Sequence, residues 1–171
     1  TAGGKVSVDA AYYKPYVYEN YDIFDIFIGS EYYFNGLCEE LGYNTEKKLS
    51  EKEMFNVMRY VKSKGPETVI FTFGSDGCKG VYGENTFSLP AMDVPVVDTT
   101  GAGDSFWGAF LYRFVKSGKS PQEITVTDAA QNTQRAFHRL NVPKWEEEPV
   151  YRIRKLLKNS LKREKSTAVI L

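Results

Sequence analysis

Two short stretches of the chain are almost continuously apolar. Residues 22–28 read DIFDIFI and residues 68–73 read TVIFTF, which is typical of strands that are buried on both faces of a parallel sheet. Residues 5–10 show a different pattern, in which β-branched valines alternate with polar side chains. That alternation predicts a third strand, with Asp9 at its end.

Glycine and serine residues predict where the first helices begin and end. A helix over residues 31–41 would end before Gly42, since glycine is the usual residue just past a helix C-terminus. Ser50, followed three residues later by Glu53, has the sequence pattern of a capping box. We therefore expect the next helix to begin after Ser50 and to run to about residue 64.

The second half of the chain adds an antiparallel unit to this pattern. Residues 78–82 and 86–89 are predicted to form a hairpin across residues 83–85. The remaining predicted elements are one strand and three helices, over residues 94–97, 103–115, 121–140 and 148–162. Because strands alternate with helices, we expect a single layered α/β/α domain over residues 1–171, with a mostly parallel sheet and a β-hairpin insertion.

The overall composition is that of a soluble globular protein. Apolar residues make up 42% of the chain, and 22 lysine and arginine residues balance 22 aspartate and glutamate residues. Zero net charge gives no indication of a nucleic acid partner, and no apolar run is long enough to span a membrane. Cys38 and Cys78 form no CxxC pair and are expected to be reduced and buried. These features predict a cytoplasmic protein.

The most informative segment covers residues 98–104, DTTGAGD, which follow a predicted strand and open a predicted helix. A glycine-rich bend lets the backbone approach a ligand closely, and the free N–H groups at a helix N-terminus favour an anion. In parallel sheets, ligands also tend to bind at the carboxyl ends of the strands, where this segment is expected to lie. The segment therefore predicts a phosphate-binding site.

Asp104, in the first turn of that helix, is open to two interpretations. A carboxylate at this position is often only a favourable partner of the helix dipole. Beside a bound phosphate it can instead take the proton from an attacking hydroxyl, while the N–H groups stabilise the charge on the transferred group. The second interpretation makes this loop a phosphoryl-transfer site.

Two commoner nucleotide-binding motifs do not occur in the sequence. A P-loop requires GxxxxGK[ST], and no stretch matches it. A dinucleotide fingerprint requires GxGxxG, but the stretch that begins at Gly101 has Phe106 at the position of the third glycine. The phosphate would therefore be bound by a different kind of loop.

Residues 96–111, VVDTTGAGDSFWGAFL, resemble the C-terminal signature of the PfkB/ribokinase family of carbohydrate kinases. The resemblance extends to residues 68–80, which are similar to the family's strand and TxGxxG turn beside the nucleotide, and to the strand at 88–97. Residues 5–9 are similar to the mid-protein strand that ends in Asp. The chain resembles only the second half of a typical member and begins abruptly without a methionine, so we expect a fragment or a processed chain with a ribokinase-like fold.

The resemblance implies a catalytic role for the glycine-rich segment. Asp104 would be the base that deprotonates the sugar hydroxyl. The backbone of Gly101, Ala102 and Gly103 would supply the anion hole for the transferred phosphoryl group.

The resemblance also implies a set of cofactor-binding residues. Thr72, Gly74, Gly77 and Thr100 would lie at the ATP site. Asp98 and Thr100 stand where members of the family often bind a monovalent cation such as K⁺. The expected cofactors are therefore ATP, Mg²⁺ and K⁺.

The sequence departs from the family at the NxxE motif, which helps to organise the magnesium ion. Ser30 stands at the Asn position and Tyr33 at the Glu position. A tyrosine cannot do the work of a carboxylate, so the divalent metal must be held in another way. One alternative is that Glu31 replaces the missing carboxylate. The other is that this helix has a different use in this protein.

Together these residues predict an ATP-dependent kinase that phosphorylates a sugar hydroxyl, with a fructose-like sugar as the preferred acceptor. Two alternatives remain, a nucleoside or vitamin kinase of the same fold and a nucleotide-binding fragment that is inactive alone. The family's sugar-recognising residues and lid lie largely in the N-terminal half, which this chain does not match. The expected partners are the sugar and ATP, without a nucleic acid or membrane, and with a homodimer formed through the family's lid.

Two groups of aromatic residues fall outside this scheme. Residues 12–33 are rich in tyrosine, which core packing and surface coverage explain better than sugar stacking. Phe106 and Trp107 directly follow the proposed base. One of the two is expected in the core and the other beside the site, and the sequence does not distinguish them.

Overall fold

The computed structural model describes residues 4–91 and 101–117. It includes the glycine-rich bend from Gly101 onwards, but the predicted cation ligands Asp98 and Thr100 lie outside the described residues. So do one predicted strand and two predicted helices, over residues 94–97, 121–140 and 148–162. A single domain over the whole chain therefore stays a prediction.

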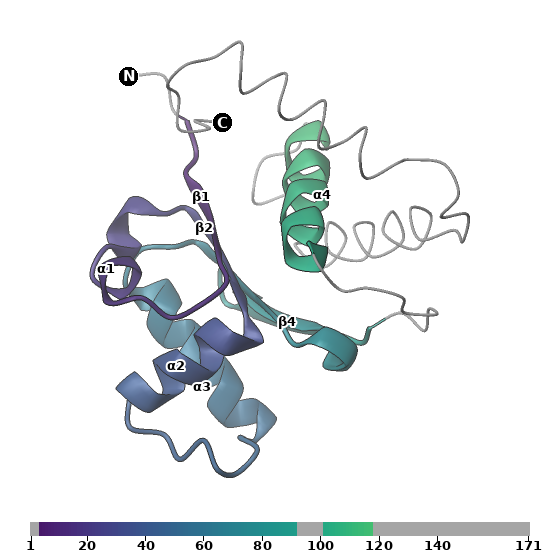
Figure 1. The fold of residues 1–171 in the computed structure, drawn as a ribbon. Helices are drawn as coiled ribbons and strands as arrows, with labels where there is room; N and C mark the ends of the chain where they lie inside the picture. The colour runs from purple at the N-terminus through teal and green to yellow at the C-terminus, as the bar shows by residue number, and fades with distance from the viewer. Residues whose placement is uncertain (1–3, 92–100, 118–171) are drawn as a thin grey trace.

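Five strands form one sheet in the order β1-β2-β3-β4-β5 (Figure 1). They are β1 Ser7–Ala10, β2 Ile26–Ser30, β3 Thr68–Thr72, β4 Cys78–Tyr82 and β5 Asn85–Leu89. The first three strands run parallel, whereas β4 pairs antiparallel with both β3 and β5. The predicted parallel strands and the hairpin insertion are confirmed.

Helices cover both faces of this sheet in the described part of the chain. They are α1 Pro15–Tyr18, α2 Glu31–Glu40, α3 Glu51–Ser63 and α4 Ala102–Lys116. Figure 1 shows α1, α2 and α3 on one side of the sheet and α4 on the other. This arrangement is the predicted layered α/β/α architecture.

The strand predicted from residue 22 begins later, at Ile26. Tyr21–Ile23 form a turn of 3-10 helix instead. Tyr21 is only 2% exposed, and its hydroxyl oxygen lies 2.8 Å from that of Tyr33. Ile23, which belongs to the predicted run, is 55% exposed, so the apolar run alone did not locate the strand's first residue.

The predicted helix ends are confirmed. Ser50 Oγ accepts a hydrogen bond from the Glu53 N–H at 3.3 Å, and the Ser50 N–H donates to the Glu53 carboxylate at 2.7 Å. This reciprocal capping box begins α3. Gly42 follows α2 with φ +77, a left-handed conformation that favours glycine.

The sheet separates two apolar cores. The core between the sheet and helices α1 to α3 includes Phe27 and Phe71. The core beneath α4 includes Ile28, Ile70 and Phe110. Successive residues of β2 and β3 therefore face opposite sides of the sheet, as the pleat requires.

The same alternation orients β1. Val8 and Ala10 belong to the core on the side of α1 to α3. Ser7 and Asp9 must then face α4, and the Trp107 indole N–H of α4 does donate a hydrogen bond to Ser7 Oγ. The polar positions of β1 are thus directed at the helix that follows the glycine-rich bend.

Cys38 and Cys78 are free and buried, as predicted. None of the helices in the described ranges combines the length and the apolar character needed to cross a membrane.

Candidate active site

The carboxyl ends of the three parallel strands lie at the same edge of the sheet. Asp9 of β1 pairs with Ile28 of β2, two residues before Ser30. Ser30 in turn pairs with Thr72, and these are the last residues of β2 and β3. Asp9, Ser30 and Thr72 therefore share the edge at which parallel sheets usually bind their ligands.

Helix α4 begins with an open N-terminus. Its N-cap residue, Gly101, has φ +79, a conformation that favours glycine, and offers no side chain to the first-turn N–H groups. Among the described residues, a Cβ added at Gly101 would meet only Asp104 Oδ2, at 3.9 Å. One added at Gly103 would have no neighbour within 4 Å outside its own helix, among the residues described. This exposed backbone suits an anion.

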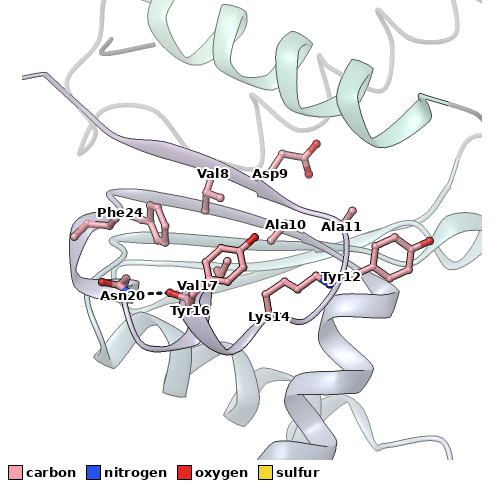
Figure 2. A pocket seen from close by; sticks show the side chains of 11 residues that line it. Val8, Asp9, Ala10, Ala11, Tyr12, Lys14, Tyr16, Val17, Asn20 and Phe24 are labelled. Atoms are coloured by element: carbon pink, nitrogen blue, oxygen red, sulfur yellow. Dashed lines mark hydrogen bonds between the residues drawn. The ribbon is translucent and has the colours of Figure 1, made fainter. Parts of the chain in front are cut away.

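The structure brings Asp104 next to a second carboxyl group, that of Asp9. Burial, together with the negative charge of Asp104 and a hydrogen bond to its side chain, raises the pKa of Asp9 to about 6. In Figure 2 the Asp9 side chain points towards α4. Because burial disfavours the ionised form of Asp9 and the adjacent Asp104 carboxylate repels it, Asp9 keeps its proton to a higher pH than an ordinary aspartate.

Asp9 was not among the predicted site residues. Its contact with Asp104 joins two elements that lie far apart in the sequence, so no local motif contains both residues. One feature of the sequence could have indicated Asp9. It stands at the carboxyl end of a predicted parallel strand, at the same edge of the sheet to which the glycine-rich segment was assigned.

The two aromatic residues after Asp104 have different environments. Phe106 is buried in the core beneath α4. Trp107 is partly buried, and its Nε1–H donates a 3.0 Å hydrogen bond to Ser7 Oγ. The residue in the core is therefore Phe106, and the residue that links α4 to the polar face of β1 is Trp107.

The predicted nucleotide turn follows β3 directly. Thr72 ends the strand and is half-buried, and Gly74 begins a short 3-10 turn with φ +52 and open space around it among the described residues. Gly77 is different, because a Cβ there would lie 2.0 Å from the carbonyl oxygen of Leu89. Gly77 is thus required by close packing of the backbone. Contact of these three residues with ATP stays a prediction.

The two residues at the NxxE positions, Ser30 and Tyr33, have structural roles. Ser30 Oγ caps α2 by accepting hydrogen bonds from the N–H groups of Tyr32 at 3.1 Å and Tyr33 at 3.3 Å. Tyr33 is fully buried, and its hydroxyl pairs with that of Tyr21. Tyr33 therefore lies in the core, where it cannot hold a metal ion at the edge of the sheet.

The carboxyl pair is the better candidate for a divalent cation. Mg²⁺ is usually held by one or two carboxylates together with substrate phosphates and water, and Asp9 and Asp104 provide two carboxyl groups at one point. Within the described residues, no group of three or more His, Cys, Asp or Glu side chains could hold a metal ion. The pair thus fits an ion that also needs oxygens from its substrate.

A pocket of about 490 Å³ lies beside β1 and α1, with Asp9 among its lining residues (Figure 2). Its lining includes Tyr12 and Tyr16, which are 61% and 66% exposed. Tyr21 and Tyr33 from the same stretch are buried in the core. The tyrosines therefore divide between core and surface as predicted, and the Asp9 carboxyl turns away from Tyr16 towards α4.

Comparison with known proteins identifies the family. The profile described as "pfkB family carbohydrate kinase" matches residues 5–131, well over half of the chain. Aminoimidazole riboside kinase of Salmonella typhimurium is 45% identical over 53 residues, which are 31% of this chain and 17% of that protein. Fructokinase-1 of Zea mays is 44% identical over 55 residues, 32% of this chain and 17% of that protein.

The fold matches as well. The crystal structure of Salmonella enterica aminoimidazole riboside kinase, complexed with aminoimidazole riboside and an ATP analogue, superimposes with a TM-score of 0.52 and 26% identity. The match covers 69% of this chain and 36% of that chain. The matches thus cover well under half of the length of each of these three relatives, and the fold is ribokinase-like, as predicted. It belongs to the pfkB family of carbohydrate kinases.

Proposed function

We propose that the protein transfers the γ-phosphoryl group of ATP to a hydroxyl group of a small sugar or riboside, with Asp104 as the general base. The observation that carries this proposal is the position of Asp104. Its carboxyl lies in the first turn of a helix whose open glycine backbone suits a phosphate, and beside a second acid on β1. Family membership supports the same class of reaction.

In the proposed reaction each group has a distinct task. The Asp104 carboxylate accepts the proton of the acceptor hydroxyl as its oxygen bonds to the γ-phosphorus, and the bond from phosphorus to the ADP oxygen breaks. The backbone N–H groups of Gly101, Ala102 and Gly103 stabilise the negative charge on the transferred group. As far as residues 4–91 and 101–117 show, the glycines at 101 and 103 leave room for the phosphate to approach.

The acidic partner Asp9 is the proposed magnesium ligand in place of the missing NxxE glutamate. When bound, Mg²⁺ neutralises charge on the phosphates. A carboxylate binds a metal ion only in its deprotonated form. Because the pKa of Asp9 is raised to about 6, Asp9 would reach this form just below neutral pH. Asp98 and Thr100 remain the proposed ligands of a monovalent cation such as K⁺.

The remaining nucleotide contacts are proposed for the turn after β3. Thr72 and Gly74 lie at the carboxyl edge of the sheet, and the open backbone at Gly74 leaves space for ATP. Gly77 contributes by shaping this turn, since its backbone packs against residues 89–91.

The acceptor class follows from the relatives. One matched protein is named for aminoimidazole riboside and another for fructose, and both acceptors carry a primary alcohol on a sugar. We therefore propose a sugar or riboside hydroxyl as the acceptor, with fructose as the first candidate.

The test is a phosphotransfer assay of the intact protein with ATP and Mg²⁺. The panel comprises fructose, ribose, aminoimidazole riboside, adenosine and pyridoxal. We expect the highest kcat/KM for one of the sugars or ribosides, with one ADP formed for each phosphorylated acceptor. A clear preference for pyridoxal would indicate a vitamin kinase, and ATP binding without transfer to any acceptor would favour the inactive nucleotide-binding alternative.

A further inference from the structure

Helix α4 is attached to β1 by a hydrogen bond between side chains. The Trp107 Nε1–H donates to Ser7 Oγ over 3.0 Å, in a partly buried position. The two residues are 100 positions apart in the sequence. This bond therefore joins two elements, β1 and α4, that are far apart in the sequence.

The bond and the carboxyl pair belong to the same interface. Ser7 and Asp9 are two residues apart on β1, so their side chains leave the strand on the same face. Asp104 and Trp107 are three residues apart on α4, so they lie on the same side of the helix, one turn from each other. Ser7–Trp107 and Asp9–Asp104 are thus two neighbouring contacts between the same strand and the same helix.

The apolar contacts of α4 are poorly suited to fix its position along the strand. They are made by side chains such as Phe106, Phe110 and Leu111, which pack in the core beneath the helix. Hydrophobic contact is not directional. A hydrogen bond, in contrast, weakens steeply when its distance or angle changes, so the Ser7–Trp107 bond restricts sliding and rotation of α4 in a way that the core does not.

We propose that the Ser7–Trp107 hydrogen bond is a positioning contact that holds Asp104 in register with Asp9, an inference that rests on the proposed function of Asp104 as the base. Trp107 acts through α4, and Ser7 acts through β1. Neither residue needs to touch the substrate. Loss of the bond would let α4 shift relative to β1, and a base displaced by a fraction of an ångström to an ångström transfers protons much less efficiently.

The kinetic test compares Ser7→Ala, Trp107→Phe and the double variant with the wild type in the intact protein. We expect each single variant to lower kcat by about tenfold, with the KM for ATP changed by less than about twofold, because positioning of the base is lost while the phosphate site remains. Since both changes break the same bond, the double variant should be no slower than the slower single variant.

Tyr18→Phe is the matched control for the loss of one hydrogen bond. The hydroxyl groups of Tyr18 and Tyr60 lie 2.7 Å apart, and Tyr18 packs against the core on the opposite face of the sheet. We expect this variant to keep its kcat. An equal fall of kcat in Tyr18→Phe, or effects of Ser7→Ala and Trp107→Phe that multiply in the double variant, would overturn the proposal.

A second measurement does not depend on activity. The Trp107 indole N–H resonance, followed by proton–nitrogen NMR, reports the hydrogen bond to Ser7 directly. This N–H is expected to exchange slowly with solvent in the wild type and faster in Ser7→Ala. An unchanged exchange rate in Ser7→Ala overturns the proposal, whereas faster exchange in a protein that phosphorylates no acceptor rejects only the proposed function.

Discussion

At the scale of single residues, the candidate site contains two acids that were recognised in different ways. Asp104 belongs to a long sequence motif and was proposed from the sequence, together with Gly101 and Gly103. Asp9 became a candidate only when the fold placed β1 beneath α4. A local pattern can identify a carboxylate at a helix N-terminus, but it cannot identify the partner that changes the acidity of the site.

The titration of Asp9 has a definite effect on stability. In the unfolded chain Asp9 would lose its proton near the ordinary value of 3.8, whereas in the folded protein it keeps the proton up to about pH 6. Between these values the folded protein binds more protons than the unfolded chain. This group therefore makes the protein less stable as pH rises through that window.

Replacement of Asp9 by Asn should remove this effect. We expect Asp9→Asn to raise Tm relative to the wild type at pH 7.5, where the wild-type carboxyl is ionised beside Asp104, and to leave it nearly unchanged at pH 4. Thermal unfolding of both proteins from pH 4 to pH 8 measures the difference. A Tm difference that stays constant with pH would show that the pKa of Asp9 is not raised in the folded protein.

At the level of strands and helices, sequence patterns predicted the type of each element more accurately than its first residue. The capping box of Ser50 and Glu53 located the start of α3 because it is a local, reciprocal hydrogen-bonded motif. The apolar run from residue 22 gave the wrong start for β2, since Ile23 is an exposed residue of a 3-10 turn although its apolar side chain looks in the sequence like that of a buried strand residue.

The glycines of the two site turns also differ in a way that the sequence did not reveal. Gly74 and Gly77 were assigned the same role, but only Gly77 is held in close contact with other backbone atoms. Such a contact depends on the path of the chain at Leu89 to Ala91, and therefore on the tertiary structure.

Helix α4 offers a direct test of the anion hole. Gly103 and Gly108 are both exposed positions of α4, with no neighbour within 4 Å of an added Cβ outside the helix, as far as the structure describes the surroundings. Alanine at either position should stabilise the helix, by up to about 1 kcal/mol in its interior. Only Gly103→Ala should weaken the binding of ATP, because only its backbone is proposed to approach the phosphate.

Calorimetry of a non-hydrolysable ATP analogue and thermal unfolding, applied to both variants, separate these effects. We expect an unchanged or higher Tm for both variants and weaker binding for Gly103→Ala alone. Equal binding by the two variants would argue against an anion hole at Gly103. A large loss of Tm in Gly103→Ala would make Gly103 a packing residue.

At the scale of the whole molecule, the sheet order, the two cores and the family profile agree on one architecture. The layered fold could be predicted because buried parallel strands and amphipathic helices have distinct periodicities. The acceptor could not be predicted in the same way. A fold shared by kinases for fructose and for aminoimidazole riboside does not determine which hydroxyl is phosphorylated.

The role of Asp104 as the base is tested most sharply with Asp104→Asn in the intact protein. Asp22→Asn, at an exposed acid distant in sequence from the glycine-rich bend, is the control. The affinity for an ATP analogue and the rate of phosphoryl transfer are determined for both. We expect Asp104→Asn to bind the analogue with a similar Kd but to transfer phosphate at least about a hundredfold more slowly, the usual scale for a positioned base, while Asp22→Asn behaves as the wild type. An undiminished transfer rate in Asp104→Asn would contradict the assignment of Asp104 as the base.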